Sequence, residues 1–222
     1  MNIYGVTIPL SDHVKILGVV LDPRITLSEH TKAISKSCFY HIRALKHIRD
    51  SLDSSMIRTI AAALVTSRLD YANSVLYGIP SKYISRLQRT QNTLARVVGG
   101  SHSHTPNRTS NLATLSQLHW LPIHDRIKFK IATMTHKAIY TCNPPYLANL
   151  VQWHTPSRNL RSASANLLSV TRCNISFGAR GFCSAAPAIW NSLPSNVRSC
   201  ETLTTFRRHL KSHLFHSAFA TA

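Results

Sequence analysis

Helical periodicity of the apolar residues is the feature that most constrains the fold of this chain. From Ser28 onward, apolar side chains recur every three or four residues, as on the buried face of an amphipathic helix. In the first segment, one face carries the apolar residues Ile34, Cys38, Ile42, Leu45 and Ile48, and Ser28 is the predicted N-cap. The same pattern predicts further helices over residues 53–76, 81–98, 112–118, 122–142, 145–151 and 203–219.

The first 27 residues have a different pattern. Residues 3–8 and the β-branched run VKILGVVL (residues 14–21) predict two short strands that form one hairpin. A hairpin alone is marginally stable in water and normally pairs with a further strand. The sequence shows no third clear strand, which suggests that a neighbouring strand is missing. Residues 152–185 show no period and predict an extended basic region, and residues 190–197 predict a turn with aromatic packing. The expected fold is therefore mainly α, with one or more helical bundles and a short N-terminal β-hairpin.

The net charge narrows the class of partner. The 222 residues include 26 Lys and Arg against 8 Asp and Glu, a formal charge of +18, whereas 44% hydrophobic residues exclude a disordered basic tail. Such a charge on a foldable chain indicates a polyanion, most simply nucleic acid, rather than a membrane. The cations lie on helix faces with no Glu four residues away, and helix 81–98 contains no acid. An ordinary solvated face is the alternative; the predicted phosphate contacts are Lys32, Lys36, Arg43, Arg86 and Arg89.

Catalysis and cofactors find little support in the sequence. Two-metal phosphoryl transfer needs closely placed carboxylates, and the chain has no Asp-Asp or Asp-x-Asp pair. It also lacks a phosphate-binding P-loop and a nucleophile elbow. The pairs His102/His104 and His209/His213, the latter with Cys200 or Cys183, fit no standard zinc spacing. We therefore predict no catalytic residue, no metal and no cofactor.

The compartment is predicted from similar arguments. No apolar stretch is long enough for a membrane-spanning helix, and residues 1–12 do not resemble a signal peptide. The five cysteines are odd in number and widely spaced, which favours reduced thiols. The expected location is intracellular, in nucleus or cytoplasm, and not secreted.

Several blocks, weak singly, together carry a resemblance to a known family. They are VKILGVVLD (14–22), CFYHIRALKHIR (38–49), ALVTSRLDYANSVLYGIP (63–80), LQRTQNTLARVV (87–98), LHWLPIHDRIKFKI (118–131), PPYLANLV (144–151), FGARGFCSAAPAIWNSLP (177–194) and TFRRHLKSHLF (205–215). In this order they resemble the C-terminal portion of reverse transcriptases from non-LTR retrotransposons, the LINE type with jockey-like and chicken-repeat-like members. The resemblance covers nearly the whole chain.

The resemblance implies a different role for each of three regions of the chain. Residues 1–27 would be an end-of-palm hairpin with Leu17, Gly18 and Val19 at a primer-grip-like centre, where glycine lets a nucleic-acid backbone approach. Residues 28–100 would be a thumb-like helical bundle and residues 101–222 a basic C-terminal helical region. The fingers and the catalytic palm, which would be a partner, are expected to lie upstream, so the chain would be a truncated RNA-directed DNA polymerase. Its expected activity is non-specific binding of RNA or an RNA–DNA hybrid. The alternatives are a host-adopted module that binds an acidic protein, and a relic without function.

Overall fold

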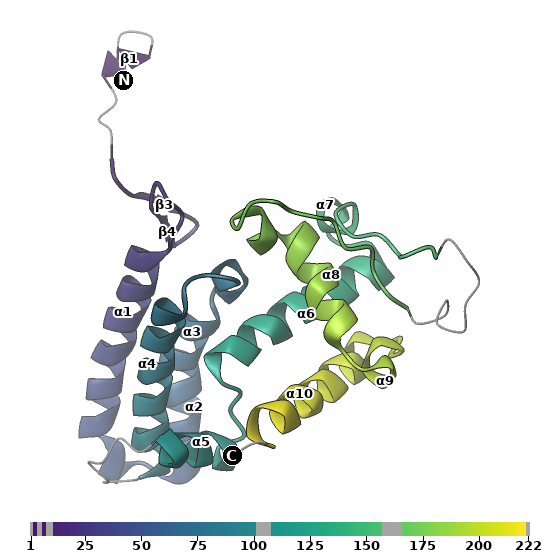
Figure 1. Cartoon of the computed structure of the whole chain (residues 1–222). Helices are drawn as coiled ribbons and strands as arrows, with labels where there is room; N and C mark the ends of the chain where they lie inside the picture. Colours follow the sequence, from purple (N-terminus) through teal and green to yellow (C-terminus); the bar gives the residue numbers. More distant parts are fainter. Residues whose placement is uncertain (1, 4–5, 8–10, 101–107, 157–165, 221–222) are drawn as a thin grey trace. The chain divides into compact units, whose positions relative to one another are not determined.

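The protein is described here from a computed structural model, which covers the chain except for residues 1, 4–5, 8–10, 101–107, 157–165 and 221–222. The described part is mainly helical, which confirms the predicted fold class (Figure 1). It divides into two compact units. The N-terminal unit comprises residues 1–72 and 79–98, and the C-terminal unit comprises residues 73–78 and 99–222. The polar segment SHSHTPNRT, residues 101–109, predicts a loop at the boundary between the two helical regions, and most of it lies outside the described residues.

The N-terminal β-structure differs from the prediction. Residues 14–21 do not form one strand; β3 (Val14–Ile16) and β4 (Val19–Leu21) pair with each other as a hairpin. A separate small pair joins β1 (Asn2–Ile3) to β2 (Val6–Thr7). The reason lies at Leu17 and Gly18, which both have positive φ, as a two-residue hairpin turn requires.

The start of α1 (Ser28–His47) differs from the prediction: its N-cap residue is Leu27, with no side-chain capping hydrogen bond. Ser28 is already helical, and its side chain makes no capping bond to the first turn. Just before the helix, the Asp22 carboxylate accepts hydrogen bonds from the backbone N–H groups of Thr26 (3.0 Å) and Leu27 (2.8 Å). Desolvation acts to raise the pKa of Asp22, but these hydrogen bonds hold it below its ordinary value. The connection between the hairpin and α1 is thus fixed by one carboxylate.

The core of the N-terminal unit lies between α1 and two further helical segments. After η1 (Arg49–Ser51), the chain forms a nearly continuous helix of α2 (Ser54–Ala61), the π-helical segment η2 (Ala62–Thr66) and α3 (Ser67–Asp70). The helix α4 (Ser81–Gly99) completes the unit. Asp53 caps α2 by accepting from Ser55 and Met56, which confirms the predicted helix start. The helical period of residues 53–76 predicts that Met56 and Leu64 lie in the core beside Ile57 and Val65. In the structure Met56 and Leu64 are exposed, so the buried stripe is narrower than the sequence suggested.

Polar contacts also hold α1 against α4. The hydroxyls of Ser35 and Thr90 are buried and lie 2.9 Å apart, within hydrogen-bond distance. Ile34, predicted in the core, is only half-buried, whereas its neighbour Ser35 takes the buried position. Small hydroxyl side chains that satisfy each other allow close helix approach without leaving an unpaired buried group.

The C-terminal unit is built around α6 (Ile123–Thr141), against which α8 (Phe182–Ser192) and α10 (Leu203–Phe219) pack. Its smaller elements are η3 (Asn73–Leu76), α5 (Arg108–Gln117), α7 (Pro145–Ala148), η4 (Gly178–Arg180) and α9 (Ser195–Arg198). The predicted final helix, residues 203–219, has the observed bounds.

An aromatic cluster forms the centre of this unit and corrects a second prediction. Trp190 does not lie in a turn; it belongs to α8 and is fully buried. His136 of α6 stacks on Phe206 of α10 with ring centroids 4.4 Å apart, and Phe206 stacks on Trp190 at 5.6 Å. Nε2 of His136 lies 2.8 Å from the Cys200 carbonyl oxygen, to which it donates as the neutral imidazole. Desolvation lowers the pKa of His136, although this hydrogen bond opposes the shift.

Candidate nucleic-acid interface

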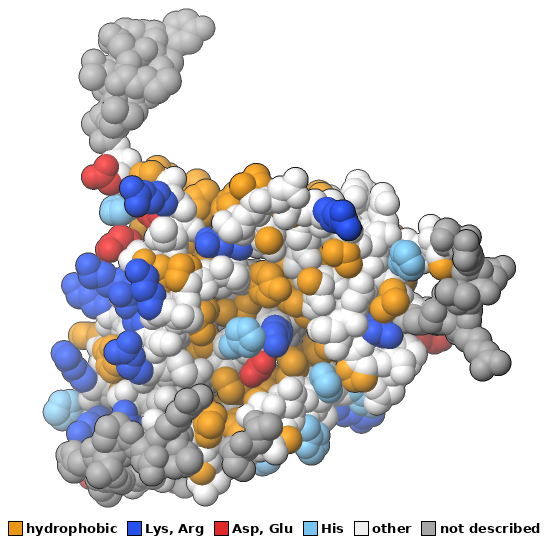
Figure 2. All heavy atoms as spheres, in the orientation of Figure 1, with side chains coloured by type: hydrophobic (Ala, Val, Ile, Leu, Met, Phe, Trp, Pro, Cys, Tyr) orange, Lys and Arg blue, Asp and Glu red, His pale blue; other side chains and the backbone are white. Residues whose placement is uncertain are grey.

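The outer face of α1 carries an exposed row of cations. Lys32, Lys36 and Arg43 are all exposed and lie within about 40° of one another around the helix axis. Figure 2 shows Lys and Arg side chains gathered along the side of the molecule that α1 forms. The buried residues Cys38, Ile42 and Leu45 occupy the opposite face, as predicted. This set of three cations, here called the α1 basic face, spans about 16 Å along the helix axis.

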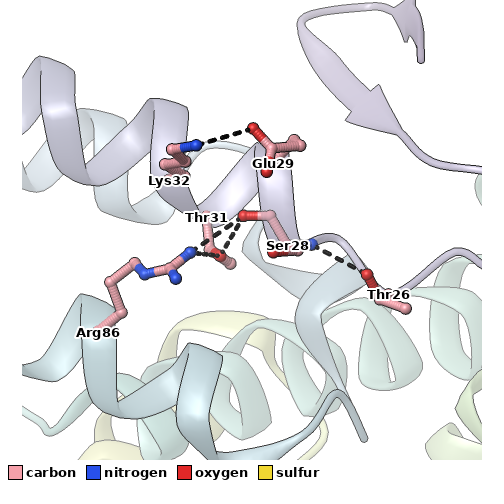
Figure 3. A network of polar contacts seen from close by, with 6 residues as sticks. All are labelled: Thr26, Ser28, Glu29, Thr31, Lys32 and Arg86. Atoms are coloured by element: carbon pink, nitrogen blue, oxygen red, sulfur yellow. Dashed lines mark hydrogen bonds and ion pairs between the residues drawn. The ribbon is translucent and has the colours of Figure 1, made fainter. Parts of the chain in front are cut away.

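Within the described residues, one acid contacts the α1 basic face, at a spacing of three residues; no Glu lies four residues from Lys32, Lys36 or Arg43. The Lys32 ammonium lies 3.5 Å from a Glu29 carboxylate oxygen, one turn closer to the helix start (Figure 3). Both side chains are solvent-exposed, at 68% and 39%, so the pair contributes little and releases Lys32 readily. Within the part of the chain that the structure describes, no ion pair involves Lys36 or Arg43.

Arg86 is not part of this surface. Its guanidinium is half-buried and donates from one nitrogen to the Ser28 carbonyl and to the Thr31 hydroxyl, both at 3.1 Å (Figure 3). The guanidinium also lies over the Tyr83 ring, 5.5 Å from its centroid. These contacts tie α4 to the first turn of α1. The structure therefore gives Arg86, predicted as a phosphate contact, a structural role.

Arg89, three residues further along α4, is exposed. Its Nε donates a long hydrogen bond of 3.4 Å to the Ser85 carbonyl of the preceding turn. Such a bond constrains the guanidinium weakly, so Arg89 stays available to an anion. Of the five predicted phosphate contacts, the structure thus leaves four accessible and one engaged within the fold.

The predicted primer-grip-like residues form the turn of the β3–β4 hairpin. Leu17 is 85% exposed, Gly18 follows it in the turn, and Val19 is buried. The place where a Gly18 side chain would start is occupied by Tyr71, whose Cε1 would lie 3.2 Å from an added Cβ. The Tyr71 hydroxyl donates to the Leu17 carbonyl at 2.7 Å. The close approach predicted at Gly18 is therefore made by a tyrosine ring of the same chain.

Two residues that the sequence did not single out position this hairpin. The sequence gives no indication that Tyr71 contacts the hairpin, yet its hydroxyl donates to the Leu17 carbonyl in the hairpin turn. The second is His30, whose Nδ1 lies 3.4 Å from the Val20 backbone N–H and accepts from it. Burial lowers the pKa of His30, which favours the neutral acceptor form. Spacing alone offers no signal for either contact, because both join segments distant in sequence or out of helical register.

The candidate metal ligands do not assemble into a ligand set within the described residues. The Cys200 sulfur lies 3.3 Å from Nδ1 of His209, but the described part of the chain contains no group of three or more potential metal ligands. His102 and His104 lie outside the described residues. The Cys200–His209 contact is a hydrogen bond between the second turn of α10 and the segment before the helix.

The C-terminal unit is the more cationic of the two by sequence. It contains 13 Lys and Arg against the two acids Asp125 and Glu201, whereas the N-terminal unit has 13 against six. Some of these cationic side chains contact other residues of the same unit. Arg198 is buried and donates to the Asn191 and Leu193 carbonyls, and Arg207 lies over the Phe129 ring.

Comparison with known proteins assigns no relative to this chain. No protein-family model, curated protein or solved structure matches it. Among the described helices, none is both long enough and apolar enough to span a bilayer.

Proposed function

We propose that this chain is a non-catalytic nucleic-acid-binding protein, related to the thumb and C-terminal region of LINE-type reverse transcriptases. It binds the phosphate backbone of RNA or an RNA–DNA hybrid without sequence preference. The observation that supports this most is the α1 basic face, where Lys36 and Arg43 are exposed. The sequence resemblance to the retrotransposon enzymes is the second support.

Phosphate contact suits this face for physical reasons. Cations that project from one side of a straight helix match a row of phosphates, and their binding releases condensed counterions. Backbone contacts carry no base information, so the binding is insensitive to sequence.

The salt dependence of binding tests the proposal. Anisotropy of a labelled RNA–DNA hybrid gives the binding constant over a range of salt concentrations. The triple variant Lys32→Ala, Lys36→Ala, Arg43→Ala should lower the slope of log K against log salt by about 2–3. The matched control is Lys130→Ala, Arg208→Ala, Lys211→Ala in the C-terminal unit, which removes the same charge from exposed positions. Circular dichroism checks that both variants fold.

The control decides between a site and a general charge effect. An equal loss of slope in the two triple variants would show that net charge, and not the α1 basic face, binds the nucleic acid. Binding of an acidic polypeptide with none of the hybrid would favour the interaction-module alternative. Primer extension by the purified chain would contradict its assignment as non-catalytic.

A further inference from the structure

An aromatic side chain lies beside the row of cations on α1, between Lys36 and Arg43 along the helix axis. Tyr40 is 72% exposed and follows Lys36 by four residues and precedes Arg43 by three, so it sits about one helical turn from each. In the described part of the chain, its hydroxyl makes no hydrogen bond, and its one ring contact is with His41 at 5.2 Å. A tyrosine held in place by packing would bury its ring, and this one does not.

The residues around Tyr40 leave one side of its ring uncrowded. Helix geometry puts the cations on one side of it and Ala33, Ser37 and Ala44 within about 60° on the other. Alanine and serine are too short to reach across an aromatic ring. A planar group can therefore lie beside the ring on that side, within reach of the neighbouring cations.

We propose that Tyr40 stacks on an unpaired nucleobase while Lys36 and Arg43 contact the adjoining phosphates, so that α1 binds a single-stranded segment. This inference rests on the proposed function, because it assigns a specific ligand class to the same face. Aromatic side chains interleaved with cations are the arrangement that binds single strands, since every base offers a π-face and the backbone supplies the charge. An isolated exposed aromatic residue needs no ligand, but here the ring and the cations occupy one face.

The inference separates two kinds of nucleic acid. In a duplex the bases are paired and stacked on each other, so Tyr40 gains nothing and only the phosphate contacts remain. In a single strand a base can leave the stack and lie against the ring. The tyrosine therefore contributes to single-strand binding alone, and this contribution is insensitive to salt because stacking releases no counterions.

The test compares Tyr40→Ala and Tyr40→Phe in the full chain. The probes are a short labelled oligouridylate and a blunt RNA–DNA hybrid of the same length, measured over a range of salt. Tyr40→Ala should weaken oligouridylate binding by about 5- to 150-fold at constant salt slope and leave hybrid binding unchanged. Tyr40→Phe keeps the ring and should bind like the unmodified chain. The matched control is Tyr146→Ala, which removes a tyrosine of similar exposure, 69%, from α7 and should change neither affinity.

A second measurement locates the contact directly. Photocrosslinking to 5-iodouridine in the oligouridylate, followed by peptide mass spectrometry, should mark the peptide that contains Tyr40. Equal weakening for oligouridylate and hybrid in Tyr40→Ala, or no weakening at all, would overturn the stacking contact. If Tyr40→Ala is silent while the triple cation variant still loses salt slope, the stacking inference fails and the proposed function stands. If the unmodified chain binds neither probe, both fail.

Discussion

Arg86 and Arg89 offer the sharpest test of whether a cation of this chain stabilises the fold or remains accessible to phosphate. Both lie on α4, three residues apart, and both were expected from sequence to contact phosphate. The structure gives Arg86 two charge-assisted hydrogen bonds within the fold and leaves Arg89 exposed. Replacing each with alanine removes the same charge from the same helix, so any difference between the two variants reports the contacts.

The expected magnitude for Arg86→Ala follows from its partners. A hydrogen bond from a charged donor contributes about 1.5–3 kcal/mol when buried. The Ser28 carbonyl also accepts from the Thr31 hydroxyl at 2.9 Å, so it is not left without a donor when Arg86 is removed. The guanidinium is moreover only half-buried. We therefore expect a loss of about 1–2 kcal/mol in the free energy of unfolding, and less than about 0.5 kcal/mol for Arg89→Ala.

Two assays should give opposite rankings. Urea unfolding followed by circular dichroism should show the larger destabilisation in Arg86→Ala. The salt slope of hybrid binding should fall by about 0.7–0.9 in Arg89→Ala and stay unchanged in Arg86→Ala. Arg86→Lys keeps the charge without the guanidinium geometry and should be destabilised as well. Equal destabilisation by the two alanine variants, or a loss of salt slope in Arg86→Ala, would refute the structural role.

Two further predictions concern the hairpin turn and the aromatic cluster. Gly18→Ala should lower the free energy of unfolding by about 1–2 kcal/mol, because φ is 81° there and the new Cβ would crowd Tyr71. The control is Gly99→Ala, whose new Cβ would make only an ordinary contact with Thr114. An equal loss of stability in Gly99→Ala would contradict the reasoning. The pKa of His136 is lower in the fold than its ordinary value of 6.5, so the unfolded chain binds the proton more readily and stability should fall as pH drops below that value. Urea unfolding between pH 8 and pH 5 should show this loss of stability, and the loss should be smaller in His136→Gln. If His136→Gln keeps the full pH dependence, a group other than His136 causes it.

Helices with one apolar face were predictable from the sequence. The last helix has the predicted bounds, and the one over residues 81–98 was predicted to within a residue, because its period and stop signals agree. The segment around Trp190 was missed for the opposite reason. Ala185, Ala186, Pro187, Ile189 and Trp190 are all buried, so α8 is apolar on most sides and shows no amphipathic period. Pro187 within the helix adds a residue that normally indicates a break.

The misassigned strand and core positions have a common cause. Apolar character predicts burial but does not detect a turn within an apolar run, such as the one at Leu17 and Gly18. Apolar character also predicts that Ile34 is more buried than Ser35. In the structure Ser35 is the more buried residue, and its hydroxyl lies within hydrogen-bond distance of the buried Thr90 hydroxyl. Both outcomes depend on contacts between segments far apart in sequence, here with Tyr71 and Thr90. Such contacts leave no periodic trace.

Contacts between distant segments also decide which cations are accessible, and the sequence pattern does not reveal them. The net charge of +18 therefore does not by itself say which cations can bind a polyanion. With only eight carboxylates available, several arginines direct their donors to backbone carbonyls: Arg49 to Val97, Arg86 to Ser28, and Arg198 to Asn191 and Leu193. Two of these acceptors, Val97 and Asn191, lie in the last turn of a helix, where carbonyls lack helical partners and a cation is favoured. An arginine so engaged keeps its charge but has a guanidinium oriented inward. The total charge therefore sets the long-range attraction of a polyanion, whereas the exposed side chains of the α1 basic face and Arg89 set where it contacts the N-terminal unit.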